Sequence, residues 1–167
     1  MIFSAGLGTR FKPWTNHHPK ALAPVNGKPL LQRNIEYLQQ YNIKDVVVNI
    51  HHFPEQMKAA IQQNNGWGSS VVISDETEEL LDTGGGMLKA RNLLDTGHLF
   101  FTLNADILTN LNLDHLLEPA EDGNRVLERL GFPFRAEQGT LQLVKTLDSV
   151  QRSLERGHRR QRGEHRH

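Results

Sequence analysis

Near its start the chain has a glycine turn of the kind that can bind phosphate. A short apolar run, Met1 to Ala5, predicts a buried strand, and Gly6-Leu7-Gly8-Thr9-Arg10 follows it directly. The two glycines of this segment permit a tight bend in which successive backbone N–H groups face an anion. Arg10 and Lys20 would add fixed positive charge beside a polyphosphate. An ordinary glycine turn with two surface cations is the alternative interpretation.

A second glycine-rich segment and an acidic segment complete the candidate site. Thr83-Gly84-Gly85-Gly86 comes after a predicted strand at 71–74, and Asn104-Ala105-Asp106 comes after one at 99–103. A carboxylate such as Asp106 at a strand end suits Mg²⁺, which takes few protein oxygens and keeps its other bonds for water and phosphate. A helix N-cap or turn aspartate is the alternative. Because ligands of open α/β sheets bind at the carboxyl ends of the strands, we expect the three segments to converge.

Alternating strands and helices are expected to position these segments. The predicted strands cover residues 1–5, 45–50, 71–74 and 99–103, and the predicted helices cover residues 30–41, 54–63 and 83–94. The β-branched run 45–50 suits a buried parallel strand, whereas 30–41 has apolar residues at helical spacing. Prolines make residues 11–29 mostly loop. The alternation predicts an α/β fold, with mostly parallel strands and helices on both faces of the sheet.

The composition changes after about residue 118. Residues 1–118 carry 9 basic and 12 acidic side chains, whereas residues 119–167 carry 10 and 7 and are rich in arginine. The alternation weakens there, although 126–130 could form a helical turn and 140–154 a helix with one apolar stripe. The last eleven residues have no apolar side chain, which predicts a solvated tail. We therefore expect a core over 1–118 and a divergent segment over 119–167, as in a truncated or frame-altered chain.

Composition also excludes several classes of function. The 19 basic and 19 acidic residues balance, so the chain as a whole gives no reason to expect nucleic acid or an anionic membrane as a partner. Cysteine is absent, which excludes a disulfide framework, a thiolate metal site and a cysteine nucleophile, and which suits the cytoplasm. No apolar run approaches the ~20 residues of a membrane span, and no signal peptide opens the chain.

Two other phosphate-binding patterns fit the sequence poorly. The Rossmann dinucleotide pattern lacks its third glycine, because Phe11 stands there, and no acidic residue ends the strand before His51 and His52. The Walker A pattern lacks its Gly-Lys-Ser/Thr. We expect both histidines at a strand end or in a loop rather than on a metal, and the acidic run 75–79 as a solvated loop.

Two longer motifs resemble a known family. Ser4-Ala5-Gly6-Leu7-Gly8-Thr9-Arg10-Phe11-Lys12-Pro13-Trp14-Thr15 and Pro19-Lys20-Ala21-Leu22-Ala23-Pro24-Val25-Asn26-Gly27-Lys28-Pro29 are similar to the signature of sugar-1-phosphate nucleotidyltransferases, or NDP-sugar pyrophosphorylases. The resemblance continues through Leu81 to Gly86 and Leu103 to Ile107, and so covers about residues 1–118. It is greatest to N-acetylmuramate α-1-phosphate uridylyltransferases and mannose-1-phosphate guanylyltransferases.

The resemblance implies a Rossmann-like nucleotidyltransferase sheet and a reaction between two small molecules. A nucleoside monophosphate would pass from a triphosphate, with UTP favoured, to N-acetylmuramate 1-phosphate or mannose 1-phosphate, and pyrophosphate would leave. Because the sugar phosphate brings its own nucleophilic oxygen, catalysis needs mainly positioning and charge neutralisation. Arg10, Lys20 and Mg²⁺ on Asp106 would supply them.

The resemblance also assigns binding roles. The residues that would hold the triphosphate are Gly6, Gly8, Thr9, Arg10 and Lys20. The residues that would face the base and ribose are Thr83, Gly84 and Gly85, with Asn104 near the sugar substrate or the ribose.

Two departures leave other functions open. Ala105 stands where the family has glycine, and no segment matches the family's later region with its second metal-binding aspartate. Asp148 lies in a helical pattern and receives no such role. The alternatives are a catalytically inactive nucleotide-binding fragment, or a regulatory or interaction module that lacks the sugar-binding half.

Overall fold

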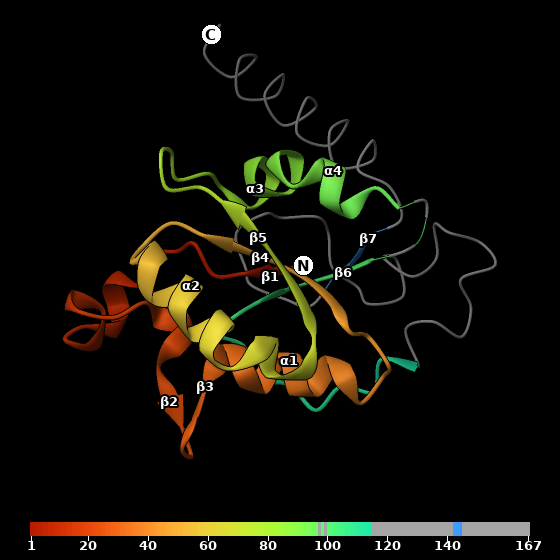
Figure 1. The fold of residues 1–167 in the computed structure, drawn as a ribbon, viewed down its shortest axis with the longest axis horizontal. Helices are drawn as coiled ribbons and strands as arrows, with labels where there is room; N and C mark the ends of the chain where they lie inside the picture. Colours follow the sequence, from red (N-terminus) through yellow and green to blue (C-terminus); the bar gives the residue numbers. More distant parts are fainter. Residues whose placement is uncertain (97, 99, 115–141, 145–167) are drawn as a thin grey trace, which may run out of the picture.

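A sheet of five strands organises the computed structural model, which describes residues 1–96, 98, 100–114 and 142–144 (Figure 1). The strand order is β5 (Ser70–Asp75), β4 (Asp45–Ile50), β1 (Ile2–Phe3), β6 (Phe100–Asn104) and β7 (Gln142–Val144). The first four strands are parallel, and β7 is antiparallel to β6. The predicted α/β fold with a mostly parallel sheet is therefore confirmed, and β1 lies between β4 and β6.

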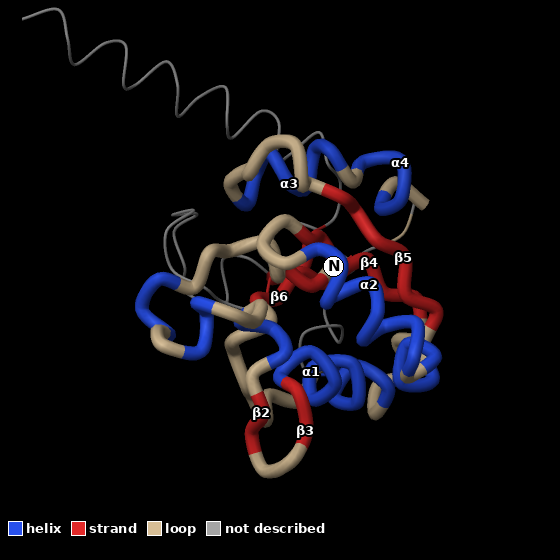
Figure 2. The backbone as a smooth tube through the Cα atoms, turned by 60° about the vertical axis from the view of Figure 1, so that its left-hand side comes forward, coloured by secondary structure: helices blue, strands red, loops and turns tan. Residues whose placement is uncertain are grey.

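Helices cover both faces of this sheet, as predicted (Figures 1 and 2). The helices α1 (Leu30–Gln39) and α2 (Pro54–Gln63) lie on one face, and α3 (Thr83–Lys89) and α4 (Arg91–Leu94) lie on the other. The predicted helix at 83–94 is thus divided at Ala90. The turn η4 (Asn65–Gly68) connects α2 to β5.

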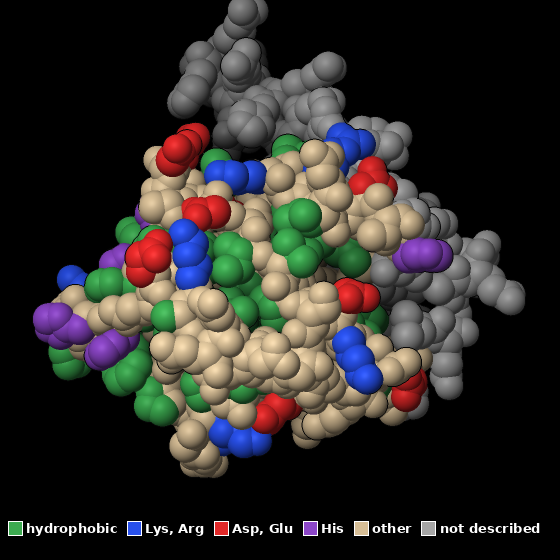
Figure 3. Space-filling view, viewed as in Figure 1, with side chains coloured by type: hydrophobic (Ala, Val, Ile, Leu, Met, Phe, Trp, Pro, Cys, Tyr) green, Lys and Arg blue, Asp and Glu red, His purple; other side chains and the backbone are tan. Residues whose placement is uncertain are grey.

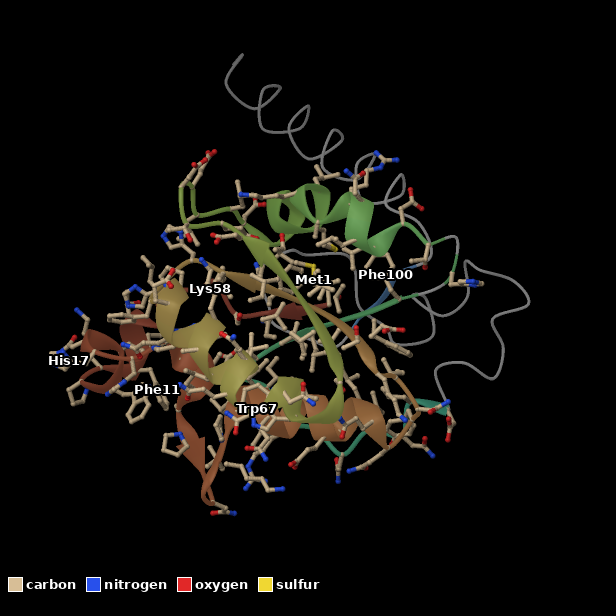
Figure 4. The ribbon with its side chains drawn as sticks, viewed as in Figure 1. Met1, Phe11, His17, Lys58, Trp67 and Phe100 are labelled. Carbon is tan, nitrogen blue, oxygen red and sulfur yellow. The ribbon has the colours of Figure 1, made fainter. Side chains whose placement is uncertain are left out.

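The core follows from the alternation of side chains along the strands. Val46, Val48 and Ile50 of β4 join the apolar cluster under α1 and α2. Val47, between them, joins the smaller cluster under α3 and α4. Met1 and Phe100 belong to that second cluster and are labelled between the sheet and those helices in Figure 4. A strand buried on both faces explains why successive residues, Val46 to Val48, are apolar rather than alternating with polar ones.

The proline-rich stretch contains short regular elements. The 3₁₀ turns are η1 (Thr9–Phe11), η2 (Trp14–Asn16) and η3 (Lys20–Leu22), and a hairpin of β2 (Pro24–Val25) and β3 (Lys28–Pro29) follows. Asn26 and Gly27 join its strands with φ values of 47° and 77°, the left-handed region that a two-residue hairpin turn requires. The Asn-Gly pair is the sequence signal for this hairpin, which the prediction of loop misses.

Residues 142–144 form a strand, so the helix predicted over 140–154 is wrong at these positions. Phe100 pairs with Val144 and Thr102 with Gln142. The helical stripe is a local pattern, whereas pairing with β6 satisfies backbone groups that would otherwise lack partners. The rest of that helix, the turn at 126–130, Asp148 and the basic tail lie outside the described residues. The boundary near residue 118 stays a prediction.

None of the helices in the described part of the chain is long and apolar enough to cross a membrane. On the face drawn in Figure 3, the basic and acidic side chains of the described residues are interspersed. That face therefore lacks the extended basic surface that is typical of nucleic-acid binding.

Candidate functional site

Two of the three predicted site segments, the glycine turn and the acidic segment, meet at the carboxyl edge of the sheet. The glycine turn follows β1, Asp106 follows β6, and these two strands are neighbours. The next strand of this sheet along the chain, β4, lies on the other side of β1, so the strand order reverses between β1 and β6. Ligands of open α/β sheets bind in the crevice at such a point. In Figure 1 the loops after β1 lie at the left, beyond the strand ends.

Gly8 determines the shape of the turn after β1. Its φ is 61°, and its carbonyl accepts hydrogen bonds from the Phe11 N–H at 2.8 Å and the Thr15 hydroxyl at 2.9 Å. A Cβ here would lie 2.8 Å from Thr15 Cγ2 and 3.2 Å from Lys20 Cβ, so the site has room for glycine alone. A Cβ on Gly6 would meet nothing within 4 Å, so the backbone there faces open space.

Lys20 and Asp106 form an ion pair at this edge, although 86 residues separate them in the chain. The Nζ of Lys20 donates to Oδ2 of Asp106, and the side chains are 26% and 36% exposed. The ring centroid of Phe11 lies 6.0 Å from the same Nζ, and Figure 4 labels Phe11 on the loops that follow β1. The pair is accessible, so an anion on Lys20 and a cation on Asp106 could separate it.

The other predicted residues of these two segments lie on the adjoining strand ends. Thr9 and Arg10 are exposed in η1, directly after Gly8. Asn104 ends β6 opposite Phe3 and is half-buried. The structure thus places Lys20 beside Gly8 and pairs it with Asp106, and it places Arg10 on the same turn as Gly8.

The glycines after β5 form the first turn of α3. The Asp82 carboxylate caps the helix by accepting from the Gly85 N–H at 2.6 Å. Thr83 is exposed, whereas Gly84 and Gly86 are buried. The small residues therefore allow α3 to begin close against the sheet, with Thr83 toward solvent.

A buried chain of polar groups joins β1, β4 and β5, and the sequence analysis missed it. The Ser4 N–H donates to Asn49 Oδ1 at 2.7 Å, and Asn49 Nδ2 donates to Glu76 Oε1 at 2.9 Å. Glu76 is fully buried and Asp75 is the last residue of β5, so the prediction of a solvated loop over 75–79 is wrong for these two residues, whereas 77–79 are exposed and outside regular structure. Packing beside Gly86 buries Glu76, and nothing in an acidic run signals such packing.

The two adjacent histidines hold backbone carbonyls at the end of β4. His51 Nδ1 lies 2.6 Å from the carbonyl oxygen of Glu76, and His52 Nε2 lies 3.2 Å from that of Thr15. Because a carbonyl oxygen only accepts, each of these ring nitrogens carries the proton. The predicted position at a strand end is confirmed, and the histidines connect this loop to its two neighbours.

Asn34 of α1 anchors the turn that carries Asp106. Its Nδ2 donates to the carbonyl of Ala105 at 2.8 Å and to that of Leu30 at 3.1 Å, and the residue is 1% exposed. The Ala105 N–H donates to the Phe3 carbonyl at 2.9 Å, and the side chain of Ala105 joins the core. The alanine that replaces the family's glycine therefore fills apolar space. Asn34 is a polar residue that lies between Leu31 and Ile35 on the apolar face of its helix. That placement is the sequence signal that could have identified it.

We expect Asn34→Ala to lower the free energy of unfolding by about 1–3 kcal/mol, because the buried carbonyl of Ala105 loses its partner. Urea unfolding measures this change. Gln32→Ala, on the same helix with a side-chain bond to Glu36, is the control and should cost less than about 0.5 kcal/mol. Equal costs for the two variants would contradict the anchoring role.

Asp75, at the end of β5, has a stabilised charge. It accepts from the hydroxyl of Thr77 and from its N–H at 2.9 Å, and Lys58 of α2 lies 3.1 Å away. These bonds, those of Thr77 first, lower the pKa of Asp75 to about 2. The same contact with Asp75, followed by one with Glu55, raises the pKa of Lys58, which is labelled on α2 in Figure 4.

A pH dependence of stability follows from Asp75. Its pKa in the folded protein lies below the reference value of 3.8, so its bonds stabilise the fold above about pH 4 and are lost as the pH falls toward 2. We expect Asp75→Asn to lower the urea midpoint at pH 7 and to match the wild-type protein near pH 2. If Asp75→Asn and the wild-type protein differed in urea midpoint by the same amount at pH 7 and near pH 2, the stabilising role of the Asp75 charge would be contradicted. Glu78→Gln, an exposed neighbour, is the control.

The residues at the carboxyl edge of the sheet fit a metal ion that is also coordinated by a bound substrate. Within the described ranges, no group of three or more His, Asp or Glu side chains could hold a metal ion. Mg²⁺ commonly takes one or two protein carboxylates and completes its shell with water and phosphate oxygens. Asp106, whose carboxylate already attracts the Lys20 ammonium, fits that kind of site. An all-protein metal cage does not fit the described residues.

The strand order, the glycine turn after the first strand and the Lys–Asp pair at the reversal point define an open α/β protein with a candidate ligand site at the carboxyl edge of its sheet. The comparison with family models is more specific, because the nucleotidyl transferase model matches residues 1–138. The chain belongs to the nucleotidyl transferase family.

Curated relatives agree with this assignment. An N-acetylmuramate alpha-1-phosphate uridylyltransferase from Caulobacter vibrioides is 40% identical over 102 residues, which are 60% of this chain and 42% of that protein. The enzyme of the same name from Neisseria meningitidis is 32% identical and is aligned over 72% of this chain and 52% of its own length. A probable mannose-1-phosphate guanylyltransferase of Arabidopsis thaliana is 32% identical over 70% of this chain and 34% of its own. The chain thus spans about half or less of these relatives.

Solved structures share the fold. HddC from Yersinia pseudotuberculosis, complexed with GMP-PN, has a TM-score of 0.64 and 27% identity over 72% of this chain and 53% of its own. A CTP:phosphocholine cytidylyltransferase from Streptococcus pneumoniae has a TM-score of 0.52 and 28% identity over 66% of this chain and 46% of its own. The Rossmann-like fold and the resemblance that the two motifs indicate are confirmed.

Proposed function

We propose that the chain acts as a sugar-1-phosphate nucleotidyltransferase that uses a nucleoside triphosphate and Mg²⁺. The contact of Lys20 with Asp106 beside Gly8, at the reversal point of the sheet, carries this proposal. It joins a cation for phosphate, a carboxylate for a metal ion and a turn that admits close backbone approach. The core over 1–118 would hold these parts, and residues 119–167 would form the divergent segment, which contributes β7 to the sheet.

The proposed reaction is a displacement at the α-phosphorus of the triphosphate. A phosphate oxygen of the sugar 1-phosphate forms a bond to that phosphorus, and the bond from the phosphorus to the oxygen of the β-phosphate breaks. The electron pair of the broken bond leaves with pyrophosphate. The nucleophile is an ionised phosphate oxygen, so the protein has to orient two anions and offset their repulsion.

The residues at the strand ends are suited to that task. Backbone N–H groups of the turn from Gly6 to Arg10 would face the β- and γ-phosphates, and the Arg10 guanidinium would pair with them. The Lys20 ammonium would lie beside the α-phosphate, where negative charge accumulates. Asp106 would hold Mg²⁺, which would supply charge neutralisation between phosphates.

The base and sugar are proposed from the relatives. Thr83, Gly84 and Gly85 would face the base and ribose, and Asn104 would lie near the sugar phosphate. UTP and N-acetylmuramate 1-phosphate are the favoured pair, because the 40% identical relative carries that activity in its name. GTP and mannose 1-phosphate are the second pair, after the guanylyltransferase relatives. Cell-wall precursor synthesis in the cytoplasm would be the setting for the first pair.

Isothermal titration and a product assay test the proposal. The 167-residue chain is titrated with UTP and with GTP in the presence of Mg²⁺, and pyrophosphate release is then followed with both sugar phosphates. Binding with turnover supports the proposed enzyme. Binding without turnover identifies a nucleotide-binding module instead, which is the second candidate because the chain spans 42% and 52% of the first two relatives. Absence of nucleotide binding overturns both.

A further inference from the structure

Glu76 is a buried carboxyl group that the proposed reaction does not use. It is 0% exposed, and Oε1 accepts from Asn49 Nδ2 at 2.9 Å. Oε2 is buried and has no hydrogen-bond partner among the described residues. A buried polar atom without a partner costs stability, and such exceptions are concentrated at functional positions. The location of Glu76 therefore calls for a role other than stability.

The side chain of Glu76 connects the two ends of the candidate nucleotide site. Through Asn49 it reaches the Ser4 N–H, two residues before Gly6 of the glycine turn. On its other side lies α3, where a Cβ on Gly86 would come within 2.8 Å of Glu76 Oε1 and 3.3 Å of Asn49 Nδ2. The carboxyl group thus lies between the strand that leads to the glycine turn and the helix that begins with Thr83.

Hydrogen bonds fix the backbone of Glu76, so its carboxyl group has a defined position between these two segments. Its N–H donates to the Ile50 carbonyl at 2.8 Å, and its carbonyl accepts from His51 Nδ1 at 2.6 Å. Asn49 is in register with Phe3 of β1 and Ser74 of β5, so the amide also has a defined place. If the Glu76 carboxyl group shifted, α3 or the side-chain amide of Asn49 would therefore move with it, and the backbone of Glu76 would stay in place.

We propose that Glu76 is a positioning residue for the nucleotide, an inference that rests on the proposed function. It sets the distance between the first turn of α3 and the glycine turn, so that base and triphosphate are held at one spacing. Gly86 is its counterpart, because only a residue without a side chain lets α3 approach the carboxyl group this closely.

Four variants of the full chain test this, namely Glu76→Ala, Glu76→Gln, Gly86→Ala and the double variant Glu76→Ala/Gly86→Ala. Glu78→Ala is the matched control, an exposed acidic residue two positions away. The Kd for UTP with Mg²⁺ is measured by titration, and kcat and KM where turnover is present. Amide hydrogen exchange over residues 4–8 and 82–87 is measured without nucleotide, and thermal melting identifies any variant that fails to fold.

Glu76→Ala and Gly86→Ala are each expected to weaken UTP binding by about tenfold or more, because a small misplacement of binding groups is costly. Glu76→Gln keeps an acceptor for Asn49 and should stay within about threefold, and the control within about twofold. Since alanine favours a helix over glycine, we attribute a loss in Gly86→Ala to the contacts of its Cβ, of which the one with Glu76 Oε1 at 2.8 Å is shorter than the one with Asn49 Nδ2 at 3.3 Å. The double variant should therefore bind UTP more tightly than Gly86→Ala alone.

Wild-type affinity and exchange in Glu76→Ala would overturn the proposal. So would a double variant whose loss is the product of the two single losses, since the residues would then act independently. If the wild-type chain binds neither UTP nor GTP, the proposed function fails and the positioning role fails with it, whereas wild-type binding that Glu76→Ala leaves unchanged overturns the positioning role alone. In a chain that binds nucleotide, faster exchange in both segments of Glu76→Ala supports the role, and unchanged exchange overturns it.

Discussion

Lys20→Ala is expected to reduce turnover by about 10²–10³-fold, the loss typical of an electrostatic stabiliser worth ~2.7–4 kcal/mol in a water-poor site. Under the proposed function, the ammonium offsets charge that grows on the phosphates as the new bond forms. Affinity for UTP should fall as well, by about tenfold or more, since hydrogen bonds to charged groups contribute about 1.5–3 kcal/mol. Pyrophosphate release measures the first effect and titration the second.

The hairpin and α1 provide a matched control for Lys20→Ala. Lys28 forms an ion pair with Glu36 at 2.7 Å, with exposures of 46% and 34%, and lies outside the candidate site. Both ion pairs are partly exposed, so either substitution should change the free energy of unfolding by about 1 kcal/mol or less. Near wild-type turnover in Lys20→Ala, or an equal loss in Lys28→Ala, would remove Lys20 from the proposed mechanism. If the chain binds nucleotide without turnover, the affinity is the deciding measurement.

The elements that the sequence predicts well are those whose signals are local. β4 and α2 have the predicted bounds, because a β-branched run favours a strand and Pro54 sits in the first turn of its helix. The alternation of such elements then implies parallel strands, and with them a shared carboxyl edge. The convergence of the glycine turn and Asp106 follows from topology, without knowledge of any side-chain contact.

The elements that the sequence does not predict depend on distant partners. β7 is three residues long and forms by pairing with β6. The local sequence around it has an apolar stripe at helical spacing, which predicts a helix because it carries no information about that distant partner. Glu76 stands in an acidic run and is buried by the approach of α3 at Gly86. In the site, the pairing of Lys20 with Asp106 is a contact between residues 86 positions apart, and neither segment alone specifies it.

Asp106→Asn is expected to reduce turnover by about 10²–10³-fold as well, and in addition to raise the Mg²⁺ concentration needed for half-maximal rate. Asparagine keeps the size of the side chain and removes the charge that attracts a hard cation. The fold should survive, because the ion pair that is lost is partly exposed. Asp114→Asn, an exposed residue in the segment that follows β6, is the control and should leave both quantities unchanged.

Binding of UTP without Mg²⁺ separates the proposed roles of Lys20 and Asp106. In the free protein the Asp106 carboxylate pairs with the Lys20 ammonium and competes with phosphate for it. Asp106→Asn removes that competitor and one repulsive charge, so metal-free UTP should bind as tightly as to wild type or more tightly. Lys20→Ala should weaken the same binding, because the attracting charge is gone. Weaker metal-free binding in Asp106→Asn would mean that this carboxylate supports the site structurally and would contradict its assignment to the metal ion.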